Sequence, residues 1–264
     1  MNGSRAQFWE EARTSSQERT AHALVLKRSD SGENSRRLTL LTQEYGKTDV
    51  IAKGAKKPAS RLAGSSELLV NAEFTWVEGR HQRFVTHVRP ITSYPQLRTD
   101  FDRLTAAIAF SEVVAISMPH DSPDEAYYNL AIEVLGHMQS HENPQVVLIW
   151  ALARLLIEEG HSPDWTRCVE TDTKMTTNPA LVSAQAGGHI CQEMAERYSD
   201  TRWISAEALI GLQKIVELEI PPTQMKNAME ALQTLVWFWG AILEKPLKAA
   251  DTYLKTLSLT DPAV

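Results

Sequence analysis

Cysteine is nearly absent from this sequence of 264 residues, in which only Cys168 and Cys191 occur. Two cysteines cannot build a disulfide scaffold, and such scarcity is typical of a reducing compartment. Long apolar runs are missing too, because the longest candidate, residues 146–157, is interrupted by Arg154 and is shorter than the roughly 18 residues of a membrane span. The first residues alternate charged and polar side chains and include no apolar stretch typical of a secretory signal. We therefore expect a cytoplasmic protein without membrane contact.

Recognisable catalytic and metal-binding motifs are also missing. Residues 46–48 (Gly-Lys-Thr) resemble the end of a phosphate-binding P-loop, but its leading glycine would stand at position 41, which is leucine. The eight histidines include no HExxH or similar metal-binding spacing. Asp100 and Asp102 lie at the expected start of a helix, where acidic residues commonly meet the positive end of the helix dipole. We expect no catalytic residues, no cofactor and no enzymatic activity, and keep a metal-dependent nuclease at these two aspartates as an alternative.

Charge is distributed unevenly along the chain, whose net charge is −6. Residues 20–95 contain twelve Lys and Arg against seven Asp and Glu, whereas residues 96–264 contain twelve against 23. A basic nucleic-acid-binding domain attached to an acidic scaffold has such an asymmetry, and so does a chance division of solvated surface charges. The sign of the whole chain therefore does not exclude nucleic acid as a partner.

The apolar pattern changes near residue 95, where the charge balance also changes. Before this point, short stretches of alternating apolar and polar residues predict five strands at residues 22–27, 38–42, 48–52, 68–77 and 84–88. Glycines at positions 32, 46 and 79 belong to the turn signals between them. Five short strands with one long basic loop favour a small closed barrel of the oligonucleotide-binding (OB) type, and a small sandwich fits the same periodicity.

After residue 95 the apolar residues recur at helical spacing, first in a stripe over residues 101–116. Ser122 begins a capping-box pattern with a proline and a glutamate behind it, and Asn143 before Pro144 predicts another helix start. The further predicted helices span residues 145–159, which Gly160 would end in the left-handed conformation, then 205–219, 222–243 and 247–257. Trp150, Trp237 and Trp239 lie in these apolar runs, so we expect them in the core.

These patterns divide the chain into three parts. Residues 1–19 are an N-terminal extension, residues 20–95 are the barrel domain, and residues 96–264 are the helical domain. Within the helical domain, residues 163–202 show no sustained period.

The longest loop of the predicted barrel is rich in cations. Lys53, Lys56, Lys57 and Arg61 lie within nine residues, where a glycine and a proline disfavour regular structure. Such a loop can follow a phosphate backbone, because each cation that neutralises a phosphate releases counterions. A solvated surface is the commoner role of a charge cluster. The same patch would be widened by two basic pairs at the ends of predicted strands, which are Lys27, Arg28, Arg36 and Arg37.

The barrel segment resembles the N-terminal domain of the RecO family, the recombination mediators of the bacterial RecF pathway. The resemblance rests on residues 23–28 (ALVLKR), 37–47 (RLTLLTQEYGK), 52–58 (AKGAKKP) and 60–64 (SRLAG), which occur in the order and at the spacing of the family. It continues more weakly through residues 93–95 and 155–164. The resemblance implies an α+β protein in which a five-stranded OB-fold barrel precedes an all-α helical domain.

The resemblance also implies a function. Proteins of this family bind single- and double-stranded DNA, anneal complementary strands, and act with RecR and single-stranded DNA-binding protein (SSB) to load RecA. Annealing needs no catalytic residue, because a basic surface that holds one strand lowers the repulsion between two polyanions. The expected phosphate contacts are Lys27, Arg28, Arg36, Arg37, Lys53, Lys56, Lys57 and Arg61, and further cations that could extend this surface or lie on its far side are Arg80, Arg83 and Arg89.

The chain departs from the family at the four-cysteine zinc ribbon that many members carry. Cys168 is followed three residues later by Thr171, and Cys191 by Met194, so each CxxC pair has lost its second thiol. A structural zinc site requires four ligands. We therefore expect no metal, and a degenerate zinc-ribbon-like insertion over residues 163–202.

The family resemblance places a docking site for the acidic, Phe-ending tail of SSB in the helical domain, which requires an apolar pocket beside a cation. Arg154 is the candidate cation, although an arginine that extends from an apolar helix to solvent is the simpler interpretation. An adaptor that mainly holds SSB and RecR, with weak DNA affinity, is the alternative to a DNA-annealing mediator.

Overall fold

The structure is a computed structural model that describes residues 18–260. The chain forms two compact units. Among the described residues, the barrel unit contains residues 18–93 together with Met118–Tyr128, and the helical unit contains Tyr94–Ser117 and residues 129–260. The extension expected over residues 1–19 lies outside the described residues, except for its last two positions, which open the first strand.

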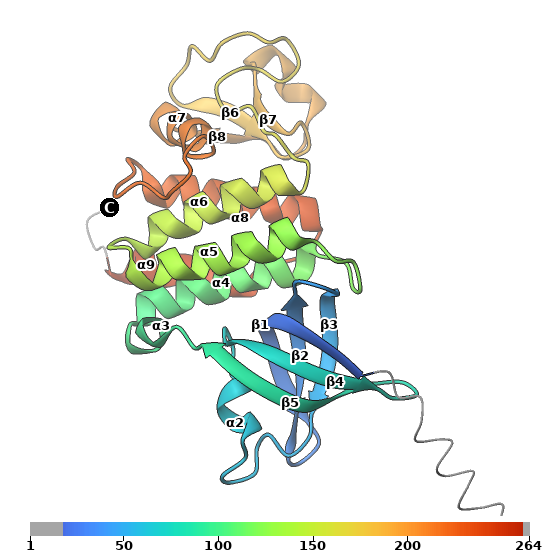
Figure 1. The fold of residues 1–264 in the computed structure, drawn as a ribbon. Coiled ribbons are helices and arrows are strands. Elements are labelled where there is room, and N and C mark those ends of the chain that lie inside the picture. The colour runs from blue at the N-terminus through green and yellow to red at the C-terminus, as the bar shows by residue number, and fades with distance from the viewer. Residues whose placement is uncertain (1–17, 261–264) are drawn as a thin grey trace, which may run out of the picture. The chain divides into compact units, whose positions relative to one another are not determined.

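Five strands form the barrel unit and close on themselves in the order β1-β2-β3-β5-β4 (Figure 1). All neighbours are antiparallel except β3 and β5, which meet in a parallel pair at Ile51 and Phe84. The closed barrel confirms the OB-type expectation and rejects the sandwich. Its elements are β1 (Glu18–Ser31), β2 (Ser35–Thr42), β3 (Gly46–Ala52), α2 (Leu62–Ser65), β4 (Asn71–Glu78) and β5 (Arg83–Thr92).

Alternate residues of β1 to β4 fill the barrel, as the period of two in the sequence predicts, and β5 adds Val85 and the partly buried Val88. Leu38 and Leu40 of β2 lie in the core with Phe74 and Trp76 of β4, and all four are at most 1% exposed. The start predicted for the fourth strand was wrong by three residues. Leu69 takes a left-handed conformation (φ 62°), so residues 68–70 form a connection and β4 begins only at Asn71.

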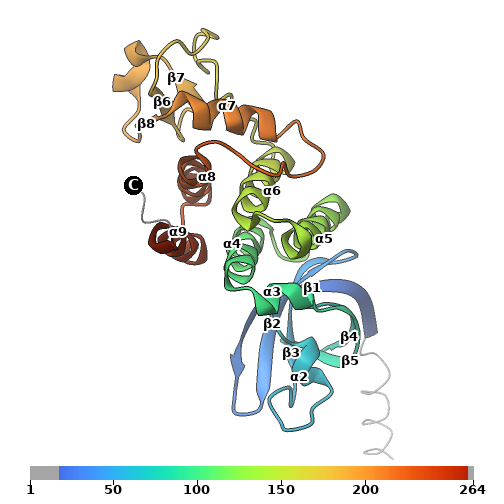
Figure 2. The ribbon, with the colours of Figure 1, turned by 90° about the vertical axis from the view of Figure 1, so that its left-hand side faces the viewer.

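Seven α-helices occur in the described part of the chain after residue 94, and five of them, α4, α5, α6, α8 and α9, run roughly alongside one another (Figure 2). α4 contacts α6, α8 and α9, while α6 also contacts α7 and α8. None of the helices within residues 18–260 has the length and apolar character needed to cross a membrane. The seven are α3 (Pro95–Thr99), α4 (Phe101–Ser117), α5 (Glu125–Ser140), α6 (Pro144–Glu158), α7 (Ala206–Ile215), α8 (Ala228–Leu243) and α9 (Lys248–Thr260).

The helix start and stop signals around α6 are confirmed. The Asn143 side chain accepts a hydrogen bond from the Val146 amide (3.2 Å), and Gly160 is left-handed (φ 79°). The capping serine predicted before α5 was wrong. Asp124 caps this helix, because its Oδ1 accepts from the Tyr127 amide at 2.9 Å and the helix begins two residues later than the capping-box pattern predicts.

Two predictions for the last helices also require correction. α7 ends at Ile215, and α8 begins at Ala228 instead of residue 222, because Asn227 is left-handed (φ 50°). Trp150 and Trp239 are fully buried as expected. Trp237 is only partly buried, and the guanidinium carbon of Arg202 lies 4.4 Å from the centre of its ring.

The stretch without a period contains a small antiparallel sheet with the strand order β7-β6-β8, built from β6 (Ala180–Ser183), β7 (Gly188–Ile190) and β8 (Arg202–Ile204), with the 3-10 helix η1 (Gln192–Arg197) between the last two. Its strands have three or four residues, which is too short for a readable alternation. This explains why the sequence pattern did not predict them.

Candidate nucleic-acid interface

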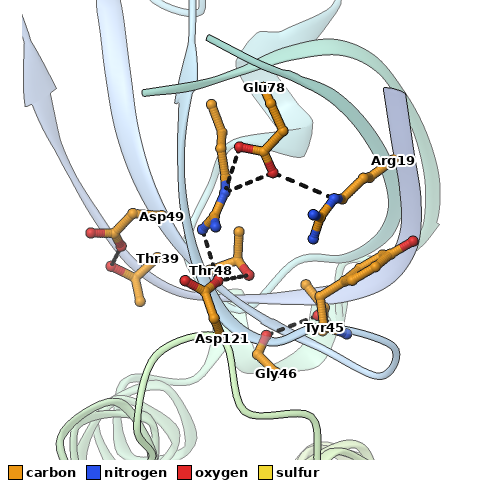
Figure 3. A network of polar contacts seen from close by, with 10 residues as sticks. Arg19, Thr39, Tyr45, Gly46, Thr48, Asp49, Glu78 and Asp121 are labelled. Carbon is orange, nitrogen blue, oxygen red and sulfur yellow. Dashed lines mark hydrogen bonds and ion pairs between the residues drawn. The ribbon is translucent and has the colours of Figure 1, made fainter. Parts of the chain in front are cut away.

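The outer face of β2 and its neighbours carries a set of polar side chains. Arg37 and Thr39 alternate with the buried Leu38 and Leu40, so they point away from the core. Thr39 lies opposite Asp49 of β3 and donates a hydrogen bond to it at 2.7 Å (Figure 3). This face of β2 and β3, with the β1–β2 and β4–β5 loops, is where OB barrels bind oligonucleotides.

A β-bulge brings Lys27 to the same face. The pairing of β1 with β2 shifts between Val25 and Lys27, so that Val25 lies opposite Leu40 and Lys27 lies opposite Thr39. Without the extra residue, Lys27 would share the inward orientation of Val25, because the two are separated by one full period of a strand. The bulge therefore turns this lysine outward.

Arg28 and Arg36 point to the opposite side of the strands, and both form ion pairs within the protein. Both guanidinium groups contact the carboxylate of Glu67, at 2.7 and 2.9 Å. Arg36 also donates to the Ala63 carbonyl (3.0 Å) and to the Ser66 hydroxyl (2.7 Å), and its side chain is 16% exposed. These contacts tie the segment around α2 to β1 and β2.

Lys53 and Lys56 are also engaged, although both remain exposed. The Lys53 ammonium lies 3.9 Å from the centre of the Phe84 ring. Lys56 binds Asp30 at 2.7 Å, and this hydrogen bond and charge hold the pKa of the Asp30 carboxyl below its ordinary value. Within residues 18–260, the remaining expected phosphate contacts are exposed and form no ion pair; they are Lys27, Arg37, Lys57 and Arg61.

A cavity of about 430 Å³ opens on the outer face of the barrel. Arg37 contributes from β2, and the turn between β4 and β5 contributes Arg80, His81 and Arg83. Gly79 makes this turn possible, because a Cβ there would come within 2.7 Å of the Gln82 carbonyl oxygen. The cavity also has two acidic residues in its wall and is lined by Arg37, Asp49, Val50, Ile51, Glu78, Gly79, Arg80, His81, Gln82 and Arg83.

The structure divides the three cations whose position the sequence left open. Arg80 is exposed at the cavity, and Arg83 forms part of its wall. Arg89 lies elsewhere and pairs with Glu73 at 3.1 Å. The sequence patterns assigned no role to His81. The feature that could have indicated one is its position in the turn between the last two strands of the barrel, because functional residues often lie in loops.

Arg83 is fixed by acids from two separate parts of the barrel unit. Its guanidinium group contacts Glu78 (3.1 Å) and Asp121 (2.9 Å), which Figure 3 shows with Arg19 and Thr48. Partial burial lowers the pKa of Arg83, but the hydrogen bonds and charges of Asp121 and Glu78 outweigh this effect and raise it. Arg83 therefore stays protonated, and the carboxylates of Glu78 and Asp121 already balance its positive charge.

The comparisons with known proteins match both parts of the chain. A family model described as "Recombination protein O N terminal" matches residues 17–94, and one described as "Recombination protein O C terminal" matches residues 98–251. The chain belongs to the RecO family. RecO is a family of non-enzymatic recombination mediators, which identifies this protein as a DNA repair protein and rejects the nuclease alternative.

RecO relatives cover most of the chain. A "DNA repair protein RecO" of Desulfitobacterium hafniense (strain DSM 10664 / DCB-2) is 29% identical over 237 residues, which are 87% of this chain and 86% of the relative. A "DNA repair protein RecO" of Desulforamulus reducens is 27% identical over 234 residues, which are 87% of this chain and 91% of the relative. A "DNA repair protein RecO" of Heliobacterium modesticaldum is 30% identical over 205 residues, which are 75% of this chain and 74% of the relative.

The four-cysteine zinc ribbon considered from the family resemblance has no complete donor set among the residues that the structure describes. The hydroxyl oxygen of Thr171 lies 3.1 Å from the Cys191 sulfur, and Met194 occupies the other substituted position. His189 is buried, with Nδ1 2.8 Å from the Leu181 carbonyl oxygen. Residues 18–260 contain no group of three or more His, Cys, Asp or Glu side chains placed to hold a metal. Two thiols with a hydroxyl and a thioether do not make a structural zinc site.

In the helical unit of this RecO protein, Arg154 of α6 is held by two contacts. Its guanidinium carbon lies 5.2 Å from the centre of the Trp150 ring, and Nη1 donates to the Glu219 carbonyl at 3.3 Å. Next to Glu219, Leu218 lines a mostly apolar cavity of about 350 Å³. Arg154 therefore has a structural role, and it also lies close to a cavity with an apolar wall.

Proposed function

We propose that this protein binds single- and double-stranded DNA on the outer face of β2 and β3 and anneals complementary strands in recombinational repair. The cavity of Arg37, Arg80 and Arg83 is the observation that carries the proposal, because it lies on the face with which OB barrels bind oligonucleotides. Lys27 extends the same face along β1. A strand bound there would have its phosphates next to cations from three parts of the barrel.

The cations differ in what they offer a polyanion. Binding by counterion release requires a charge that is not already neutralised by the protein. Arg37 and Arg80 meet this condition among the described residues, whereas Arg36 and Arg83 are bound to carboxylates. We therefore infer that the primary phosphate contacts are Lys27, Arg37, Lys57, Arg61 and Arg80, and the secondary ones are Arg28, Arg36, Lys53 and Lys56.

Annealing follows from such a surface without any reacting group. Two single strands repel each other, and cations along one backbone lower that repulsion while the base edges stay accessible. The non-enzymatic character of the RecO family agrees with this mechanism. In the cell, we expect the protein to act in the cytoplasm with RecR and SSB to load RecA.

The test is DNA affinity as a function of salt. Fluorescence anisotropy with labelled single and double strands should give a negative slope of log K against log salt, and the magnitude of this slope should decrease by about one for each of Arg37→Ala and Arg80→Ala. Arg89→Ala is the matched control, because Arg89 is an exposed barrel cation that pairs with Glu73 and does not line the cavity. If all three variants bind like the parent protein, the assignment of this face to DNA is wrong.

An adaptor role is the second candidate. It is favoured by the ion pairs that neutralise three of the eight expected phosphate contacts, and by the acidic balance of residues 96–264. An adaptor should anneal SSB-coated strands much better than naked ones. A DNA-annealing mediator should anneal both.

We place the SSB tail at the apolar cavity near Arg154. An acidic peptide that ends in Phe needs an apolar wall for the ring and cations for its carboxylates. Ile210, Leu218 and Met225 supply the apolar wall, while Lys214 and Lys226 supply cations beside one acid, Glu207. Lys214→Ala should weaken binding of a tail peptide in calorimetry and leave DNA binding unchanged. Unaltered peptide affinity in this variant and in Arg154→Ala would overturn the placement.

A further inference from the structure

The two cysteines of the chain lie against each other. Cys168 follows α6 in the turn-rich segment, and Cys191 comes directly after β7. The Cys191 amide donates to the Cys168 sulfur at 3.1 Å, and the Thr171 hydroxyl oxygen lies 3.1 Å from the Cys191 sulfur. The segments are also joined by the bond from the Val169 amide to the His189 carbonyl, at 2.9 Å. The sulfurs are therefore held together by backbone contacts on both sides.

The environment of the pair favours one thiolate. Burial raises the pKa of the Cys168 thiol, but hydrogen bonds from the Cys191 thiol, the Thr171 hydroxyl and two backbone amides outweigh it and lower this pKa to about 7. The same bond raises the pKa of Cys191, because its proton is donated to Cys168. At neutral pH the pair thus holds a substantial fraction of thiolate, the form that reacts with oxidants.

A small oxidant has a route to the pair. Cys191 is partly exposed and lines a cavity of about 470 Å³, together with Thr171, His189 and Met194. Cys168 is 1% exposed and lies behind it. Hydrogen peroxide fits such an opening, whereas a bulky disulfide reagent would meet Cys191 first.

We propose that Cys168 and Cys191 are an oxidation site at which hydrogen peroxide joins the two thiols in a reversible intramolecular disulfide. In the first step a thiolate sulfur attacks peroxide, so that an S–O bond forms, the O–O bond breaks, and the departing hydroxide takes up a proton to become water. In the second step the other sulfur attacks the sulfenic acid. The S–S bond forms, the S–O bond breaks, and hydroxide leaves with that thiol's proton as a second water.

The test counts thiols on the full chain. Because the sequence has only these two cysteines, peroxide should lower the number of free thiols from two to none in the unfolded, quenched protein. The monomer should lose two hydrogen atoms in its intact mass, and dithiothreitol should restore both thiols. Trypsin cuts after Arg167, Lys174 and Arg197, so the oxidised protein should yield the peptide 168–174 linked to the peptide 175–197.

Single-cysteine variants separate proximity from simple reactivity. Cys168→Ser and Cys191→Ser should be folded, as judged by circular dichroism, and should give no linked peptide with peroxide. In each variant the remaining thiol should proceed to sulfenic and sulfinic acid. The proposal is overturned if the parent chain keeps both thiols, if it is oxidised to sulfinic acids without the linked peptide, or if only disulfide-linked dimers form.

Discussion

Arg36 and Arg37 are consecutive residues of β2, yet they point to opposite faces of the barrel wall. Arg36 is bound to Glu67 and to the segment around α2, and its side chain is 16% exposed. Arg37 is exposed and lines the cavity on the outer face. Two residues with the same charge therefore have different roles, one in folding and one in the proposed DNA contact.

We predict that Arg36→Ala destabilises the protein and that Arg37→Ala does not. Removing Arg36 leaves Glu67 with one cation fewer and leaves the Ser66 hydroxyl and the Ala63 carbonyl without this donor, which should cost about 2 kcal/mol. Arg37→Ala should change stability by less than about 0.5 kcal/mol, since it removes an exposed side chain. Urea denaturation of both variants measures the difference.

The same pair gives a control for DNA binding. Arg37→Ala should weaken affinity severalfold and lower its salt dependence, whereas folded Arg36→Ala should keep most of its affinity. Equal losses of DNA affinity in the two variants would contradict the division of roles between the two faces.

Asp30 should oppose DNA binding, because its carboxylate holds the Lys56 ammonium at 2.7 Å. Asp30→Asn releases this lysine for a phosphate and removes a negative charge, so we expect affinity to rise about threefold at low salt. Glu73→Gln is the matched control. It makes the same change of charge and frees Arg89. Glu73 belongs to β4, however, and β4 pairs only with β1 and β5, so it is not a neighbour of β2 or β3, which form the proposed DNA face. If both variants bind DNA more tightly by the same factor, net charge explains the gain and Lys56 is not a contact.

The barrel could be predicted from the sequence because burial of alternate residues is a local pattern. The face of each cation could not. At Lys27 the cause is the bulge after Val25, which reverses the alternation without a glycine or proline to signal it. At Arg28 and Arg36 the cause is Glu67, a partner more than 30 residues away that no spacing rule identifies.

The cavity was less predictable than the barrel, because it joins residues from distant segments. Arg83 is anchored by Asp121, which belongs to the connection between α4 and α5 and returns to the barrel unit. The helical unit shows the same limit at Trp237. An apolar run identifies its helix, but which side of the helix is covered depends on neighbours far along the chain.

Gly46 is required by the connection between α4 and α5, which contains Ser122. It is not required by a bound nucleotide, as its resemblance to the end of a P-loop would suggest. A Cβ at this position would lie 2.0 Å from the Ser122 carbonyl oxygen, and its φ of 67° is left-handed. Gly46→Ala should therefore cost about 3 kcal/mol or more of unfolding free energy. Gly32→Ala is the control, since Gly32 has a similar φ of 70° with no atom within 4 Å of the added carbon. It should cost only about 1 kcal/mol. Equal losses in urea denaturation would show that the contact with Ser122 does not constrain Gly46.

Asp100 and Asp102 at the start of α4 should respond to substitution with opposite signs. Burial raises the pKa of Asp102, and the nearby Tyr253 side chain offsets only part of this rise, so the folded state retains its proton to higher pH than the unfolded state does. The free energy of unfolding contributed by this group therefore falls as pH rises from its ordinary pKa of 3.8 through the raised value. Asp102→Asn removes this loss, and its stability relative to the parent protein should increase between pH 3 and pH 7.

Asp100→Ala should instead destabilise the protein at pH 7. The Asp100 carboxylate accepts from the Arg103 amide at 3.1 Å and contacts the Arg103 guanidinium at 3.2 Å, so its loss should cost about 1 kcal/mol. Urea denaturation of both variants and of the parent protein at pH 3, 5 and 7 distinguishes the two carboxyl groups. These pH values extend from below the ordinary pKa of an aspartate to well above it. If Asp102→Asn loses stability at pH 7 as Asp100→Ala does, the interactions of the ionised carboxylate, with the helix dipole among them, outweigh the cost of burying the Asp102 charge.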